Sequence, residues 1–378
     1  MIIFIYIVSG LLVLLLLLVW FEVKRASLKS EKHVLKFILQ NPKRSSFFVI
    51  ENGKTVVNVQ SDVKRPLASV VKIMVLAEFV EQVTEKQIDP NEIVSLESIN
   101  RFYIPNSDGG AHPKWLYDLK EQGLNPEQGF TIIEVARGMM SYSSNANTEF
   151  LMERLGLDAI NSKIQNWQLQ DHDPLFPFSS AILMPTYLMD TLGLSIRNAG
   201  ALMRSFSYDE YATKSVEIFG LLREDREGKW IRQLNRRERS KVRLQRIWSE
   251  KFPRSTVKEY ARLLYNIHEG KWLKGQSQLL FLELMNVDVK NKERFVKAGV
   301  KGGSSLAIIN QTLYSEDVEG NKLQIAMFVH DPFGGDQMWL EKKSFGFLNK
   351  YVADEAFKKQ VNQTLRKIGT EKSLPLAD

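Results

Sequence analysis

Apolar and polar positions are mixed along most of the chain, but the first part of the sequence is almost entirely apolar. Residues 2–21 are interrupted only by Ser9 and Gly10, and a helix of that length spans about 30 Å, the thickness of a bilayer core. No basic stretch precedes this run, and the nearest small residues, Ala26-Ser27, make a poor cleavage site. We therefore predict a transmembrane anchor at residues 1–22 rather than a cleaved signal peptide.

A helix and a hairpin are predicted next. Apolar residues recur at helical intervals in the basic segment 23–44, which we interpret as a connector that contains one helix. Two β-rich runs, Phe47–Glu51 and Thr55–Gln60, then flank Asn52-Gly53. An Asn-Gly pair between such runs is the strongest short signal for a β-hairpin.

Helical periodicity dominates the middle of the chain, and strands return near its end. An apolar helix is predicted at Val70–Val83, and another begins after Thr131, which would cap it. The last part of the chain predicts two strands and then a helix with a break near Gly346; these elements are Leu306–Tyr314, Leu323–His330 and Asp336–Ile368.

The order of these elements predicts the fold class and the domain boundaries. A hairpin, many helices, late strands and a final helix indicate an α+β fold with one antiparallel sheet beside an all-helical region. The early and late strands would lie together in that sheet. We place one domain at residues 45–368, with a basic insertion at about residues 187–254 and a tail at residues 369–378.

The charge of the chain indicates a basic surface segment but does not identify its partner. The net charge is +7, and the segment Leu222–Lys251 contains eleven Lys or Arg against five Asp or Glu. A solvated pair of charged helices accounts for this composition. The alternative is a surface that rests on anionic lipid or wall polymer, with apolar contacts from Trp230, Ile231, Ile247 and Trp248. A nucleic-acid partner is disfavoured because no nucleic-acid-binding motif accompanies the charge.

Composition excludes several classes of chemistry. The chain has no cysteine, so it has no disulfide, no Cys-ligated zinc and no thiol nucleophile. Its five histidines are scattered, without the close spacing that a zinc hydrolase uses. We expect no metal and no organic cofactor.

Serine chemistry remains, and its first signal is a Ser-x-x-Lys pattern. The pattern occurs three times, but Ser61 lies in a polar turn and Ser255 precedes a helix as an ordinary cap. Ser69 differs because it begins an apolar helix with Lys72 on the same face. Burial would lower the pKa of that lysine and let it accept the serine proton, and the helix start offers free N–H groups for an oxyanion hole. Taken alone, a capping serine with a chance lysine is the better explanation of the pattern.

Two later segments supply the parts that such a site needs. Ser143-Ser144-Asn145 follows an apolar helix at a polar elbow, and Lys301-Gly302-Gly303-Ser304 lies near the late strands. Together with Arg65–Lys72, these runs resemble the three signatures of the serine penicillin-recognising enzymes. Within that group the class A β-lactamases are the most similar, because the second motif has the form Ser-x-Asn. The resemblance covers about residues 45–350 and implies the β-lactamase/transpeptidase-like fold.

The resemblance also implies a role for each motif residue. Ser69 would attack a carbonyl group and form an acyl-enzyme, with Lys72 as general base. Ser143 would relay a proton to the leaving nitrogen, and Lys301 would bring a positive charge beside it. The backbone N–H groups of Ser69 and Ser304 would form the oxyanion hole. The residues expected to bind substrate are Asn145, Gly303, Ser304 and Ser305.

Two departures from the family pattern bear on the substrate. The loop that normally carries the deacylating glutamate offers only Asp171, His172 and Asp173, which we interpret as loop caps, while Glu149 lies too soon after the elbow. Gly302 replaces the usual hydroxyl residue of the third motif. We expect acylation to be intact and fast hydrolysis of the acyl-enzyme to be impaired.

These observations predict a membrane-anchored β-lactamase-like serine hydrolase that acts on β-lactam or D-alanyl peptide amides. Its domain is expected outside the cytoplasm, although Lys24 and Arg25 after the anchor favour the opposite orientation. The alternatives are an esterase, an inactive envelope scaffold that binds peptidoglycan stems or a protein, and a polyanion-binding module centred on residues 222–251.

Overall fold

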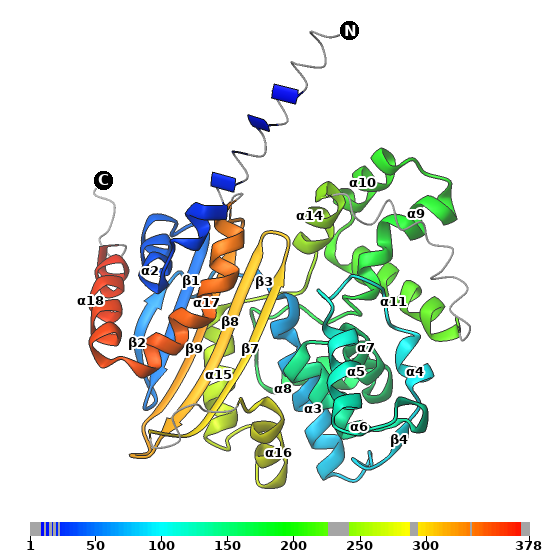
Figure 1. Ribbon diagram of the computed structural model, residues 1–378. Coiled ribbons are helices and arrows are strands. Elements are labelled where there is room, and N and C mark those ends of the chain that lie inside the picture. Colours follow the sequence, from blue (N-terminus) through cyan, green and yellow to red (C-terminus); the bar gives the residue numbers. More distant parts are fainter. Residues whose placement is uncertain are drawn as a thin grey trace.

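The computed structural model describes residues 23–225, 242–287, 294–332 and 335–371, together with residues 9, 10, 13, 14, 17, 20 and 21 (Figure 1). Within these residues, no helix combines the length and the apolar character needed to cross a bilayer. Most of the predicted anchor at residues 1–22 lies outside the described residues, so the anchor stays a prediction. The same holds for residues 226–241 of the basic segment and for residues 372–378 of the tail.

The sheet brings the two ends of the chain together. Its order is β2-β1-β9-β8-β7, and every neighbouring pair is antiparallel. The hairpin turn places Asn52 and Gly53 at φ 49° and 76°, the left-handed conformations that a tight two-residue hairpin requires. The predicted antiparallel sheet of early and late strands is therefore confirmed. The strands are β1 (Ser45–Glu51), β2 (Lys54–Val59), β7 (Phe295–Ser305), β8 (Ile308–Asp317) and β9 (Lys322–His330).

Three helices pack on one face of the sheet: α2 (Glu31–Gln40), α17 (Gly335–Ala353) and α18 (Glu355–Glu371) (Figure 1). Val34 and Ile38 of α2 are fully buried in the same core cluster as Phe47 and Phe347. The segment from residue 31 is therefore part of the packed domain and not only a connector. The C-terminal helix also breaks later than the sequence predicts. Gly346 lies inside α17, and the break comes at Asp354, whose carboxylate accepts the Phe357 N–H.

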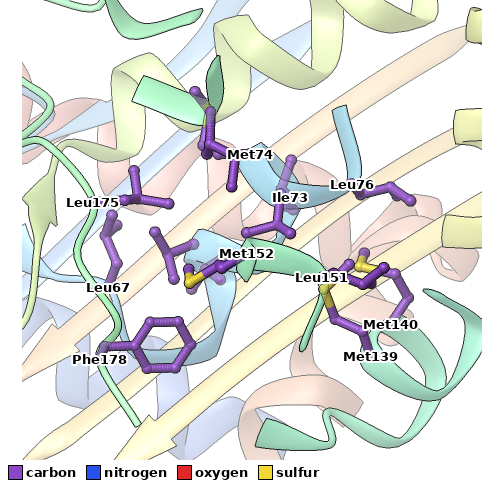
Figure 2. Packing of buried hydrophobic residues seen from close by; sticks show 14 of the residues in the cluster. Leu67, Ile73, Met74, Leu76, Met139, Met140, Leu151, Met152, Leu175 and Phe178 are labelled. Carbon is purple, nitrogen blue, oxygen red and sulfur yellow. The ribbon is translucent and has the colours of Figure 1, made fainter. Parts of the chain in front are cut away.

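The helical region covers the opposite face of the sheet and is centred on a helix that is buried on nearly all sides. Ten of the thirteen residues of α3 (Lys72–Thr84) are buried. Figure 2 shows Met74 and Leu76 of this helix among side chains of neighbouring segments, including Met139 and Met152. This packing fixes the rotation of α3 and hence the direction of Lys72. The surrounding helices include α5 (Ala111–Glu121), α6 (Ile132–Arg137), α7 (Asn145–Leu155), α8 (Leu157–Asn166), α15 (Val257–His268) and α16 (Gln276–Met285).

The described parts of the predicted basic insertion are largely helical. Its described elements are α9 (Met184–Leu192), α10 (Ile196–Ser205), α11 (Tyr208–Glu224) and α14 (Val242–Glu250). Ile247 is 7% exposed in the core, and the ring of Trp248 packs against Phe252. Ile247 is therefore unavailable for the alternative contact with a membrane or polymer, whereas Trp248 is half-buried, and that contact stays a prediction. Trp230 and Ile231 lie outside the described residues.

Candidate active site

Ser69 lies in a short turn that two neighbouring segments hold in place. The turn, η1 (Ala68–Val71), follows the two-residue strand β3 (Arg65–Pro66), and α3 begins only at Lys72. Ala68 has φ 47°, a left-handed conformation that is uncommon for a residue other than glycine. The amide of Asn310 on β8 donates to the Pro66 and Leu67 carbonyls at 2.8 and 2.9 Å. Asn310 therefore fixes the approach to Ser69, a role that no local sequence signal indicates.

Lys72 is fully buried, and its ammonium group donates hydrogen bonds to the elbow motif. Its Nζ donates to the Ser143 carbonyl at 2.6 Å, to Ser143 Oγ at 3.2 Å and to Asn145 Oδ1 at 2.8 Å. Burial, followed by the nearby charge of Lys301, holds the pKa of Lys72 well below its usual value. A lysine in this environment can be neutral and accept a proton.

Lys301 approaches the same hydroxyl from the sheet. It lies in the middle of the edge strand β7, and its Nζ donates to Ser143 Oγ at 3.0 Å and to the Gly302 carbonyl at 3.1 Å. Burial lowers the pKa of Lys301 to about 7. The Ser143 hydroxyl therefore lies between two buried lysines, either of which can exchange a proton with it.

The elbow itself is built to project Ser143. It follows the π-helical turn η3 (Gly138–Tyr142), and Ser143 adopts φ 68° before Ser144 caps α7 by accepting the Asn147 N–H. His112 on α5 contacts Ser144 Oγ and Asn147 Oδ1 at 3.0 and 3.2 Å. Sequence reasoning missed this support, because His112 is a single histidine more than thirty positions from the motif.

Gly303 brings the edge strand against the start of the nucleophile turn. A Cβ atom at this position would lie 2.7 Å from the backbone nitrogen of Ser69 and 2.8 Å from that of Val70. The next residue, Ser304, is exposed. The hydroxyl of Ser305 lies 2.8 Å from that of Ser249 on α14 and is part of the wall.

These residues surround a single cleft of about 330 Å³. Six of the eight residues predicted for the site line it, and Lys72 and Lys301 lie buried behind its floor. Sequence reasoning did not find other lining residues, among them Asp108, Gln311 and Glu341. The cleft is lined by Ser69, Ser107, Asp108, Gly109, Ser143, Asn145, Gly302, Gly303, Ser304, Ser305, Ile309, Gln311 and Glu341.

The loop after α8 presents an aromatic ring to Lys72. Lys72 Nζ lies 5.8 Å from the centre of the Phe178 ring. Glu149 of α7 is fully buried beside this loop, and its carboxylate accepts the Ser180 N–H at 2.7 Å and the Ser180 hydroxyl at 2.5 Å. Burial raises the pKa of Glu149 to about 7. The carboxyl group of Glu149 therefore anchors the loop instead of lying free in the cleft.

The polar residues at the start of this loop hold it in place, as predicted. Asp173 pairs with Lys64 at 2.5 Å and accepts the Arg254 N–H at 3.0 Å, while His172 contacts the hydroxyl of Tyr260. Across the described ranges, no group of three or more His, Asp or Glu side chains could hold a metal ion.

Comparisons with known proteins agree with this arrangement. A model of the beta-lactamase enzyme family matches residues 29–307. The chain therefore belongs to this family of penicillin-recognising serine enzymes, as the three motifs predict. A comparison with curated proteins found no match.

Among solved structures, a class A beta-lactamase that matches with a TM-score of 0.50 has the same β-lactamase/transpeptidase-like fold. A class A beta-lactamase from Bacteroides cellulosilyticus DSM 14838 is 16% identical with a TM-score of 0.50, and the match covers 90% of this chain and 99% of that one. A beta-lactamase from Chitinophaga pinensis DSM 2588 is 14% identical, with coverage of 82% and 94% and a TM-score of 0.49. A PBP-A mutant in an acyl-enzyme complex with penicillin G is 16% identical, with coverage of 84% and 96% and a TM-score of 0.47.

Proposed function

We propose that the protein is a membrane-anchored serine hydrolase that forms an acyl-serine intermediate with β-lactam or D-alanyl peptide amides. The observation that carries this proposal is the Ser143 hydroxyl, which lies 3.2 and 3.0 Å from the Nζ atoms of two buried lysines beside the cleft that contains Ser69. Burying two lysine side chains costs free energy. Lysines with lowered pKa values beside a cleft are typical of functional sites, which favours a catalytic role over a structural one.

The geometry supports a complete acylation step. Neutral Lys72 takes the proton of Ser69 while Ser69 Oγ attacks the carbonyl carbon of the substrate. The N–H groups of Ser69 and Ser304 stabilise the oxyanion that forms. As the carbon–nitrogen bond breaks, Ser143 gives its proton to the leaving nitrogen and recovers one from the protonated Lys72 or from Lys301. The product is the acyl-serine; the amine departs when the substrate is a peptide and stays attached to the acyl group when the substrate is a β-lactam.

Hydrolysis of the acyl-serine is less well supported. Among the described residues, no carboxylate forms a hydrogen bond with Lys72, and Phe178 lies on the loop side of its ammonium group. Glu149, whose charge acts on Lys72, has both carboxylate oxygens bound to Ser180. We therefore propose that the acyl-enzyme is long-lived, as suits a peptidase or a poor β-lactamase.

Covalent labelling tests the proposal directly. A soluble domain that begins at residue 29, incubated with a fluorescent penicillin and followed by intact-mass spectrometry, should gain one adduct per molecule that persists for minutes to hours. The Ser69→Ala variant should gain none, although it keeps its fold, because the change removes one hydroxyl at a turn and costs about 1 kcal/mol.

The other outcomes separate the alternatives. Equal labelling of the variant would place the nucleophile elsewhere. If the domain reacts with aryl esters but not with penicillin, the esterase alternative holds. No adduct with either compound, in a folded domain that still binds peptidoglycan fragments, would contradict the enzyme proposal in favour of the scaffold.

The membrane anchor is proposed on a separate observation. Five described apolar side chains of the N-terminal segment are each more than half exposed: Val13, Leu14, Leu17, Trp20 and Phe21. Such a row of exposed apolar residues is expected where lipid covers them. The full-length chain should sediment with membranes after alkaline extraction, and a chain without residues 1–28 should not. Recovery of both chains in the supernatant would contradict the anchor.

A further inference from the structure

The cleft ends at a face of α17 that points toward the edge of the sheet. The side-chain amide of Gln337 donates a hydrogen bond to the Ser305 carbonyl at 3.1 Å and accepts one from the Ala307 N–H at 3.0 Å. Seven residues later, the Ser344 hydroxyl accepts a hydrogen bond from Gln311 at 3.3 Å. Glu341 lies between them at the spacing that keeps all three on one helix face, and it lines the cleft. The end of β7 and Glu341 therefore border the same space.

Glu341 is the carboxylate of the cleft that remains available to a ligand. The other one, Asp108, caps the start of α5 by accepting the N–H groups of Gly110 and His112 at 3.2 and 3.1 Å. Glu341 is exposed and forms no hydrogen bond or ion pair with any residue that the structure describes. Its carboxylate is therefore open to solvent and to a ligand in the cleft.

No positive charge offsets Glu341 within the described lining of the cleft. That lining contains two carboxylates and neither lysine nor arginine. Lys72 and Lys301 are buried beneath the cleft, where the Nζ atom of each donates a hydrogen bond to Ser143 Oγ. On α14, Arg246 is paired with Asp331 at 2.6 Å and with Glu250 at 3.0 Å.

The third motif also lacks a group that would favour an anion at this end. Gly302 has no side chain, and the space where one would begin lies 3.0 Å from the amide of Gln311, its partner on β8. A carboxylate placed beside Glu341 would be repelled, whereas an ammonium or guanidinium group would form a charge-assisted hydrogen bond.

We infer that Glu341 is a specificity-determining residue and that the cleft selects substrates with a protonated amine or guanidinium group at the Glu341 end. The inference rests on the proposed function for the identity of the cleft, and it narrows that function to cationic amides. A substrate that places a carboxylate beside Glu341 should acylate Ser69 more slowly, because the two negative charges repel each other.

Equilibrium binding to the Ser69→Ala variant tests the charge preference without any turnover. Three matched acyl-peptides, identical except for an ammonium, a methyl or a carboxylate group at the end of a short side chain, would be titrated by calorimetry at low and high salt. We expect the ammonium peptide to bind about tenfold more tightly than the carboxylate peptide. This ratio should shrink with salt.

Two further variants assign the preference to one residue. Adding Glu341→Gln should reduce the ratio to about one, and adding Glu341→Lys should invert it. Glu121→Gln, the same change at an exposed glutamate that ends α5, should leave the ratio unaltered. A ratio near one before any change at Glu341, or a ratio that Glu341→Gln does not alter, would overturn the inference.

The outcome is independent of the acylation experiment. A normal charge preference without labelling of Ser69 would contradict the proposed hydrolase and retain the binding site. Labelling of Ser69 without a charge preference would support the hydrolase and overturn the role of Glu341.

Discussion

Replacing Lys72 with methionine should slow the acylation of Ser69 by about 10² to 10⁴-fold, because general base catalysis contributes about that much. Methionine matches the shape of the lysine stem but cannot accept a proton. The free energy of unfolding should change by no more than about 2 kcal/mol, since the loss of three hydrogen bonds is offset by the removal of a buried amine. Stopped-flow labelling and urea titration measure the two effects.

The pH dependence of the same reaction follows from the lowered pKa of Lys72. Lys72 accepts a proton only when neutral, so the acylation rate of the native protein should be highest above its pKa and fall as the pH drops through it. Lys72→Met should lose this dependence. Native and variant profiles of the same shape would show that another group is the base.

Lys163 provides a matched control for the Lys72 substitution. It is also a buried lysine of the helical region, but its Nζ pairs with Glu78 at 2.9 Å and with Glu81, away from the cleft. Lys163→Met leaves two carboxylates without their cation, so it should lower the free energy of unfolding and leave the acylation rate of the folded protein unaltered. A comparison of the two variants would thus separate an effect on the acylation rate from an effect on the free energy of unfolding.

Replacing Gly303 with alanine should reduce acylation by at least about 10²-fold, although only one methyl group is added. The new Cβ would lie 2.7 Å from Ser69 N, 2.8 Å from Val70 N and 2.9 Å from the Leu67 carbonyl oxygen. These are backbone atoms, so the strand or the turn must move apart. That movement displaces the N–H groups proposed to hold the oxyanion, and it should also destabilise the fold by about 1 to 3 kcal/mol.

Gly302→Ala is the control for this substitution. The three atoms nearest to a Cβ at Gly302 all belong to the side chain of Gln311, at 3.0 to 3.4 Å, and that side chain can rotate away. Both variants add one methyl group to the same strand, and only Gly303→Ala should lose activity. Similar losses in the two variants would mean that the contact between Gly303 and the turn is not what sets the reaction rate.

The parts of the structure that the sequence predicted are those encoded by neighbouring residues. Asn52-Gly53 specifies its hairpin because both residues tolerate a left-handed backbone. Ser69 and Lys72 are separated by a single turn, and the polar elbow after an apolar helix marks Ser143. The three motifs were expected to meet, and the structure brings them together around one cleft.

The parts that could not be predicted depend on contacts between distant residues. Glu149 was set aside because it lies too soon after the elbow, and only the fold brings it to Ser180, thirty-one positions later. Ile247 was expected on a surface because its segment is basic, but its own side chain lies on the buried face of α14. Glu341 carries no motif, and it reaches the cleft only because α17 packs on β8.

The order of strands in the sheet also constrains how the protein is made. β1 has β2 on one side, but its other side is completed by β9, with Ser45 opposite Val329. At about 5 to 20 residues per second, the ribosome finishes β9 roughly 15 to 60 s after β1. During that time one edge of β1 has no partner strand. The apolar side chains of Phe47 and Val49 also lack the part of their core that β9 supplies. The sheet therefore closes only after β9 has been made, and until then β1 presents the kind of unpaired strand edge that favours aggregation.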